Sequence, residues 1–300
     1  MPRLPIPDSD VNSWGGILHE FLRVAHREDG ALRGVAEAIN VKDFGAVGDG
    51  STDDSAAIQR ALDTVLDRTL FFPAGRYCVS AALTFNGPLH FAADALLKAQ
   101  TGAQIIINRA ILAAPDAVVF DVDDVVAEAR CDDFCDPICN EQTGAGPFII
   151  RWAGKVYANW WSGSNMGAQW NNMRAALPSR LQGVGEAATL AIVGLHEITT
   201  TMNWNDLRGD CHPVKIDLSE AHLIGKTNGK PVIEMLNSRH VIVEALTLYG
   251  AMDAHTPNIG ILLGRTNEGN ASGEHLFTNF RVRGGYTVAA VYIVDSEIGK

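Results

Sequence analysis

The sequence predicts a mainly β protein in which short strands form stacked coils and helices are few. Apolar runs of about four to six residues alternate with turns that contain glycine, asparagine or proline. Between residues 83 and 126 no helix-sized crossover separates these runs, which argues against βα units. Glycine accounts for 29 of the 300 residues, as expected where turns punctuate many strands.

The chain is organised around residues 41–62, which predict a short strand, a glycine-dense loop and a helix. The loop glycines permit positive φ, so the chain can fold back tightly. The hydroxyl and acidic side chains that follow can accept hydrogen bonds from the first helical turn. One face of the helix is apolar and carries Ala57, Ile58, Ala61, Leu62 and Val65. The residues assigned to this structural cap are Gly45, Gly48, Asp49, Gly50, Asp53 and Asp54.

Residues 41–62, together with a strand, turn and strand predicted at 70–77, resemble the segment that opens many pectate-lyase-superfamily proteins. This superfamily includes polygalacturonase-like enzymes and bacteriophage tail spikes. The resemblance covers roughly residues 40–85. It implies a right-handed parallel β-helix with capping helices, the first of which covers the open end of the stack. A phosphate-binding loop is the alternative, but no Lys-Ser or Lys-Thr pair follows Gly50.

Charge and hydropathy exclude several classes of function. A net charge of −11 and a pI near 5.2 argue against sequence-independent binding to nucleic acid, because carboxylates repel phosphate. The N-terminus lacks the apolar core of a signal peptide, and no apolar run is long enough for membrane insertion. We therefore expect synthesis in a reducing cytosol, where the five cysteines need not pair.

A separate amphipathic helix is predicted before the cap, between residues 8 and 30. Its apolar stripe contains Trp14, Ile17, Leu18, Phe21 and Leu22. The segment resembles the leader of many bacteriophage tail-fibre and tail-spike proteins. That resemblance implies that residues 1–36 attach a homotrimer to other virion tail or baseplate proteins. A helix packed along the side of its own β-helix is the alternative.

A partial internal sequence repeat predicts a second, degenerate copy of the capping module at residues 156–205, after a first module at 37–155. Residues 156–163 repeat the strand and glycine turn, and residues 170–177 repeat the helix. Ala168 and Gln169 stand where the first copy has Asp53 and Asp54. We therefore expect Ser164 or Asn165 to cap the second helix.

The pattern of residues 206–300, short strands separated by glycine-containing turns, is typical of stacked coils. The strands are predicted at 214–218, 232–235, 241–248, 259–263, 280–282 and 288–293. No amphipathic helix follows the last strand. We therefore expect a partner or further chain to close this end of the stack.

Glycan cleavage would need paired carboxylates in a hydrolase, or a base beside a neutralised uronate in a lyase. The candidate catalytic residues are Asp217, Glu234, Glu244, Asp253, Glu274, His240 and His275. None of them forms the Asp-Asp or Gly-His-Gly arrangement of polygalacturonases. Solvated turns and ladder partners are the alternative interpretation for each of them, so whether the protein is an enzyme stays open.

Two further clusters suggest binding sites. Trp152, Trp160 and Trp170 are candidates for stacking on sugar rings, and a core beneath the second helix is the alternative. Cys131, Cys135 and Cys139 suggest a metal site only weakly, because Pro137 interrupts a helix and no fourth ligand is close. We expect no cofactor.

These observations predict a virion tail-spike or tail-fibre component, made in the host cytoplasm, that recognises a host surface polysaccharide. Depolymerase activity is an extension that would belong to the full-length protein. The first alternative is a free polysaccharide lyase or glycoside hydrolase of the pectate-lyase superfamily. The second is a non-catalytic structural component of a virion or injection device.

Overall fold

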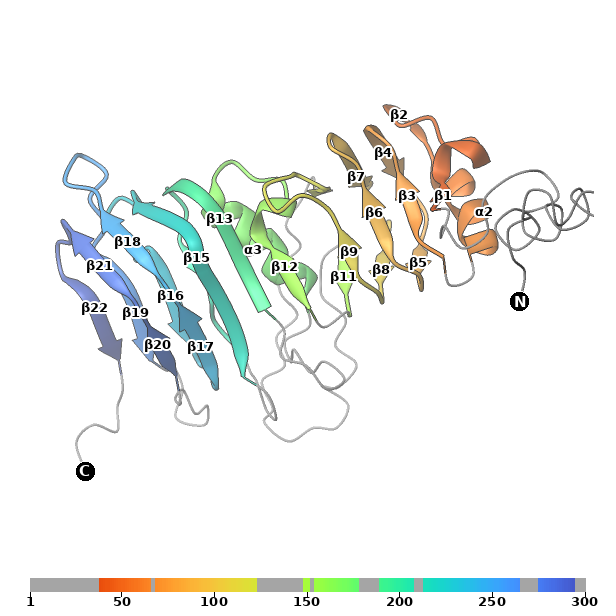
Figure 1. The fold of residues 1–300 in the computed structure, drawn as a ribbon. Coiled ribbons are helices and arrows are strands. Elements are labelled where there is room, and N and C mark those ends of the chain that lie inside the picture. Colours follow the sequence, from red (N-terminus) through yellow and green to blue (C-terminus); the bar gives the residue numbers. More distant parts are fainter. Residues whose placement is uncertain are drawn as a thin grey trace, which may run out of the picture.

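The computed structural model describes residues 38–65, 68–122, 148–151, 154–177, 189–207, 213–264 and 275–294. The described chain is mainly β, and its strands form five sheets in which neighbouring strands run parallel. The coils follow one another along one axis, as the colours in Figure 1 show. The predicted N-terminal helix with its stripe Trp14, Ile17, Leu18, Phe21 and Leu22 lies outside the described residues, as do Trp152, Glu274 and the three clustered cysteines.

A first stack occupies residues 38–151. Its elements are β1 (Ile39–Asn40), η1 (Val41–Phe44), β2 (Asp49–Asp53), α2 (Ser55–Val65), β3 (Leu70–Phe72), β4 (Gly75–Val79), β5 (Leu83–Phe85), β6 (Leu89–Phe91), β7 (Ala95–Ala99), β8 (Ile105–Ile107), β9 (Ile111–Leu112), β10 (Phe120–Val122) and β11 (Phe148–Ile150). They form the sheets β1-β3-β6-β9, β2-β4-β7-β10 and β5-β8-β11. Leu70, Leu89 and Ile111 lie in register on successive coils and are buried, so each coil covers the inner row of the one before it.

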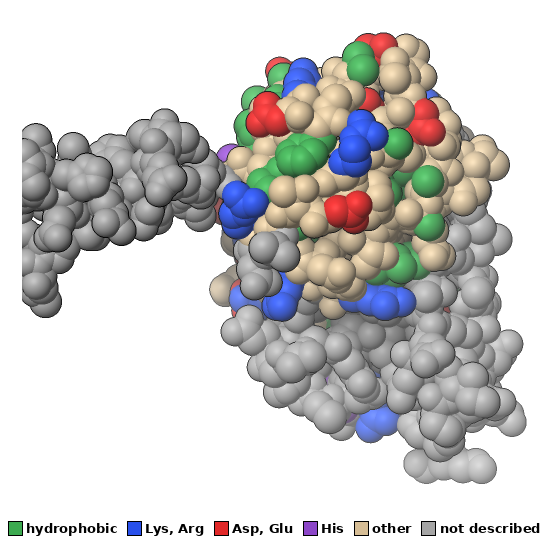
Figure 2. Space-filling view, turned by 90° about the vertical axis from the view of Figure 1, so that its right-hand side faces the viewer, with side chains coloured by type: hydrophobic (Ala, Val, Ile, Leu, Met, Phe, Trp, Pro, Cys, Tyr) green, Lys and Arg blue, Asp and Glu red, His purple; other side chains and the backbone are tan. Residues whose placement is uncertain are grey.

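The helix α2 lies at the end of this stack beside β1 (Figure 1). Ala57, Ile58 and Ala61 are buried, whereas the residues on its opposite face are exposed. Figure 2 views this end of the molecule and shows positively charged, negatively charged and scattered apolar side chains together. The end that carries α2 is therefore suited to contact with water.

The glycine loop before α2 is held by aspartates in a way that differs from the prediction. The Asp54 carboxylate accepts hydrogen bonds from the backbone N–H groups of Val47 and Gly48, at 2.6 and 3.1 Å, so it closes the loop. The Asp53 carboxylate accepts hydrogen bonds from the backbone N–H and the hydroxyl of Ser55 in the first turn of α2, as predicted for a cap. Ser51 and Thr52 belong to β2, because strand pairing with β4 takes this segment before the helix begins.

A strand, a 3-10 helix and an α-helix recur in the middle of the chain as β12 (Lys155–Tyr157), η3 (Ala158–Trp160) and α3 (Met166–Ala176). The Asn165 side chain accepts a hydrogen bond from the Gly167 N–H at 2.9 Å, which confirms its predicted capping role. The helix starts at Met166, so Asn165 takes the place of Asp54, and the predicted match of Asp54 with Gln169 is wrong. The second copy has a shorter loop because it lacks a counterpart of β2.

A second stack contains β13 (Thr189–Ile198), β14 (Met202–Asn203), β15 (Val214–Gly225), β16 (Ile233–Leu236), β17 (Val241–Glu244), β18 (Thr247–Gly250), β19 (Ile259–Gly264), β20 (Leu276–Thr278), β21 (Arg281–Gly284) and β22 (Ala289–Val294). One sheet runs β12-β13-β15-β17-β20, with β18 and β21 attached through β15, and the other runs β14-β16-β19-β22. The predicted strand at 241–248 is two strands, because Ala245 adopts φ +57° and turns the chain between them.

No helix of the described residues is long and apolar enough to cross a membrane.

Candidate functional site

The two stacks meet at a seam that is paired on one side. Phe120 and Trp161 form a parallel bridge, in which the Val119 N–H donates to the Trp160 carbonyl and the Ser162 N–H to the Phe120 carbonyl, both at 2.8 Å. On another side, the sheet that ends at β9 and the sheet that begins at β12 do not pair within the described chain. A pocket at this place is lined by residues of β6, β9, β12 and η3 and of the segment that follows β9.

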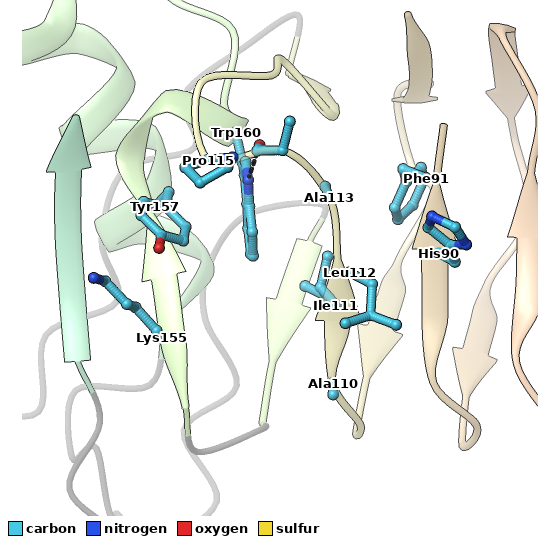
Figure 3. Close-up of a pocket in the computed structure, with 11 residues that line it drawn as sticks. His90, Phe91, Ala110, Ile111, Leu112, Ala113, Pro115, Lys155, Tyr157 and Trp160 are labelled. Atoms are coloured by element: carbon cyan, nitrogen blue, oxygen red, sulfur yellow. Dashed lines mark hydrogen bonds between the residues drawn. The ribbon is translucent and has the colours of Figure 1, made fainter. Parts of the chain in front are cut away.

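This pocket is an open groove of about 550 Å³. Figure 3 shows Lys155 and Tyr157 on its β12 side and His90 and Leu112 on the other side, with Trp160 between them. The lining residues are His90, Phe91, Ala110, Ile111, Leu112, Ala113, Ala114, Pro115, Lys155, Tyr157 and Trp160. A mostly apolar lining with a few polar groups is typical of a small-molecule or sugar site.

The aromatic wall of the groove is fixed in place. The ring centroids of Tyr157 and Trp160 lie 5.3 Å apart, and the Trp160 indole N–H donates to the Ala114 carbonyl at 3.0 Å. Trp160 is only 2% exposed, so it supports the groove from beneath, whereas Tyr157 is half-buried and presents part of its ring. Tyr157 is therefore the aromatic group most available to a ligand on this wall.

Lys155 supplies a positive charge at the same wall. Its Nζ lies 2.9 Å from Asp217 Oδ2 and 5.2 Å from the centroid of the Tyr157 ring. Burial alone would lower the pKa of Lys155, but the hydrogen bond and charge of Asp217 outweigh it and raise that pKa. Lys155 is therefore a cation at neutral pH and is unsuited to act as a base.

Two of the predicted carboxylates are neighbours on the face beside the groove. Asp217 on β15 lies in register with Glu244 on β17. Asp217 pairs with Lys155, and Glu244 pairs with Lys215 at 2.8 Å. Burial acts to raise the pKa of Asp217, but hydrogen bonds from Ser219 and Lys155 lower it to about 2. Asp217 is therefore ionised at neutral pH, which does not suit a general acid.

The other predicted catalytic residues lie apart from the groove. Glu234 on β16 accepts a hydrogen bond from the Asn205 side chain at 2.8 Å. Asp253 lies in the turn after β18 and accepts from the His255 N–H at 2.8 Å. His240 precedes β17 and His275 precedes β20, and the pKa of His275 is lowered by burial and by the neighbouring His240. These residues do not converge with Asp217 on one reacting centre.

The tryptophan candidates have different environments. Trp170 is fully buried and packs on Trp204, with ring centroids 5.2 Å apart and ring planes tilted by 37°. Its indole N–H donates to the Asn203 carbonyl at 2.8 Å. A ring enclosed in this way has no face for a sugar, so its environment fits the alternative of a core residue. Trp160 lines the groove, as noted above.

Sequence reasoning missed Lys155, Tyr157 and His90. The aromatic residues near position 160 were a signal for this region, but nothing local indicated that His90 lies across from them. Within the part of the chain that the structure describes, no three His, Cys, Asp or Glu side chains cluster as a metal site would require. The proposed cysteine ligands Cys131, Cys135 and Cys139 lie outside that part.

Residues 38–121 match the family model described as rhamnogalacturonase A/epimerase, pectate lyase-like. Mannuronan C5-epimerase AlgE4 of Azotobacter vinelandii is 56% identical over 46 residues, which are 14% of this chain and 8% of that protein. The match thus spans a small fraction of the curated relative.

Two solved structures are also similar. The A-module of the same epimerase has 17% sequence identity and a TM-score of 0.32, over 85% of this chain and 67% of that chain. The enzymatically active domain of tailspike protein 2 from bacteriophage CBA120 has 15% identity and a TM-score of 0.33, over 89% and 44%. At TM-scores this low, neither structure guides the assignment of a function.

Proposed function

We propose that this chain recognises a host surface polysaccharide as a component of a phage tail spike or tail fibre, and that the groove binds acidic sugars. The pectate-lyase-like match of residues 38–121 supports a polysaccharide-directed role. The leader at residues 1–36 supports the virion role through its sequence alone. Right-handed winding, capping by α2 and α3, and assembly as a homotrimer belong to the same proposal.

The observation that carries the sugar proposal is the position of Lys155 beside Tyr157. An acidic sugar presents a carboxylate and, on its ring, an apolar C–H face. Lys155 donates to Asp217 and can direct a remaining ammonium N–H at the first. The Tyr157 ring can pack against the second. A neutral sugar would use only the aromatic part of the groove, so the site should favour uronate-containing chains.

Binding is a better assignment for this groove than hydrolysis. Asp217, which pairs with the groove residue Lys155, has a pKa of about 2 and stays ionised. A free lyase or hydrolase remains the alternative function. It would be favoured by release of reducing ends or unsaturated uronates from acidic polysaccharides.

The test is titration of the purified chain with fluorescently labelled oligogalacturonate and with a neutral maltooligosaccharide of equal length. Lys155→Met should weaken oligogalacturonate binding roughly tenfold, because one charge-assisted contact is lost, and should leave neutral-sugar binding unchanged. Lys155→Arg should restore most of the affinity. Tyr157→Ala should weaken both ligands.

The matched control is Lys226→Met. The Nζ of Lys226 lies 2.6 Å from Glu197 Oε1, and neither residue lines the groove. This variant should leave both affinities unchanged. Equal affinity of the wild type and Lys155→Met for oligogalacturonate would refute the role of the groove.

For the virion role, light scattering should give three times 32.2 kDa for the full chain. A variant that starts at residue 38 should lose binding to tail particles.

A further inference from the structure

A row of outward-facing side chains runs from the groove into the first stack. Phe71 on β3, His90 on β6 and Leu112 on β9 lie in register on successive coils. The residue before each of them is buried, and side chains alternate across a strand, so these three lie on the outer face of the sheet. We call them the outer row. His90 and Leu112 also line the groove (Figure 3), whereas Phe71 lies one coil beyond His90.

The outer row presents a continuous apolar and aromatic surface. Leu112 is 53% exposed, His90 is exposed and Phe71 is half-buried. The ring centroids of Phe71 and His90 lie 5.1 Å apart, with the ring planes tilted by 47°. Neighbouring strands of a sheet lie about 4.8 Å apart, so the two steps from Leu112 to Phe71 cover about 10 Å. Pyranose rings in an extended chain follow one another at a similar spacing, so successive sugars can lie over successive coils.

On the other side of the groove, the corresponding outer positions are unsuited to an acidic chain. Tyr157 is in register with Ala191, and Ala191 with Asp217 and Glu244 on the next two coils. Ala191 is buried, and the two carboxylates are held by lysines. A uronate chain that continued in this direction would find no second aromatic ring at these positions. It would lie against Asp217 and Glu244 and be repelled.

The charges that border the outer row are compatible with an acidic ligand. Arg109 is exposed in the turn before β9, and Lys155 begins β12, so both cations lie at the starting ends of their strands. Asp94 and Asp116 lie in the turns that follow β6 and β9, at the other ends of the strands. Asp67, before β3, lies outside the described residues. A chain on the outer row can therefore turn its carboxylates toward Arg109 and Lys155.

We infer that the outer row is a second subsite of the groove, over which an acidic polysaccharide runs across the coils from Lys155 toward the end that carries α2. One uronate is held by Lys155 and Tyr157, and the sugars that follow it pack on Leu112, His90 and Phe71. The inference rests on the proposed function of the groove. It adds a direction and a dependence on chain length, which the groove alone does not give.

The test compares labelled oligogalacturonates of two lengths, a trimer that fits the groove and a heptamer that reaches Phe71. The wild type should bind the heptamer roughly tenfold more tightly than the trimer. Phe71→Ala should remove most of this gain and leave the trimer affinity within about twofold of the wild type. The matched control is Tyr249→Ala, which removes a 37% exposed ring on β18, outside both the groove and the outer row. It should keep the full gain.

Amide hydrogen exchange of the wild type provides a second measurement that does not depend on the folding of Phe71→Ala. The heptamer should slow exchange in peptides that contain β3 and β6, and the trimer should slow it only around the groove. Equal gains for the wild type and Phe71→Ala, or heptamer protection of β15 and β17 instead of β3, would overturn the second subsite and leave the groove as a sugar site. Failure of the wild type to bind either oligomer would overturn the proposed function, and the second subsite with it.

Discussion

Replacing Trp170 distinguishes a core residue from a sugar-binding platform. The indole belongs to α3, packs on Trp204 and is fully buried, so Trp170→Ala removes a large packed side chain and leaves a cavity. Such changes destabilise proteins by about 3–5 kcal/mol. The loss of the bond to the Asn203 carbonyl adds about 1 kcal/mol when that oxygen is left buried. We therefore expect a loss of about 4–6 kcal/mol.

The assay is urea unfolding followed by circular dichroism, with amide exchange at α3 as a local measurement because stacked coils need not unfold together. Trp170→Phe is the matched control. It retains a ring and loses the indole N–H, so we expect a smaller loss of about 1–2 kcal/mol. A stable Trp170→Ala variant with reduced affinity for oligosaccharides would refute the assignment of Trp170 to the core.

Three more predictions concern pH, backbone conformation and helix capping. The pKa of Asp217 is about 2 in the folded chain, against an ordinary value of 3.8. Asp217 therefore adds up to about 2 kcal/mol to the free energy of unfolding above pH 4, and this stability is lost as the pH falls toward 2. The urea midpoint of Lys155→Met should vary less over this pH range than that of the wild type. Gly75→Ala should cost more than about 2 kcal/mol, because the residue has φ +151° and its added Cβ would lie 2.8 Å from a loop carbonyl oxygen. Gly102→Ala, with φ +87° and open space around it, should cost about 1 kcal/mol, and equal losses of thermal stability for the two would contradict the steric argument. Asn165→Ala should destabilise the chain by about 1 kcal/mol and speed amide exchange in the first turn of α3, whereas unchanged exchange there would contradict the capping role.

Local patterns in the sequence were sufficient for most strands and for one cap. The predicted runs at 214–218 and 259–263 match the start of β15 and all of β19 except its last residue. Asn165 caps α3 because its short polar side chain directly precedes the helix. The turn at Ala245 was missed, since alanine at positive φ carries none of the usual signals of glycine or asparagine.

The groove could not be predicted because it depends on contacts between distant residues. Lys155 and Asp217 belong to different coils, and His90 comes from the stack on the other side of the seam. Tryptophan in a sequence suits both a core and a sugar platform, and the burial of both Trp160 and Trp170 fits the core role. Asp54 was assigned to the helix, but its carboxylate bonds the glycine loop instead, which residue type alone does not reveal.

The one-sided pairing at the seam gives the molecule an uneven mechanical character. Where Phe120 and Trp161 pair, backbone hydrogen bonds resist separation of the two stacks. Within the described chain, β9 and β12 border the groove without pairing, so no strand hydrogen bonds join the two stacks there. Bending of one stack relative to the other is therefore concentrated at this seam. Bending in one direction widens the groove, and bending in the other direction narrows it. Under the proposed function, an oligosaccharide in the groove would act as a wedge, and its binding should stiffen this joint.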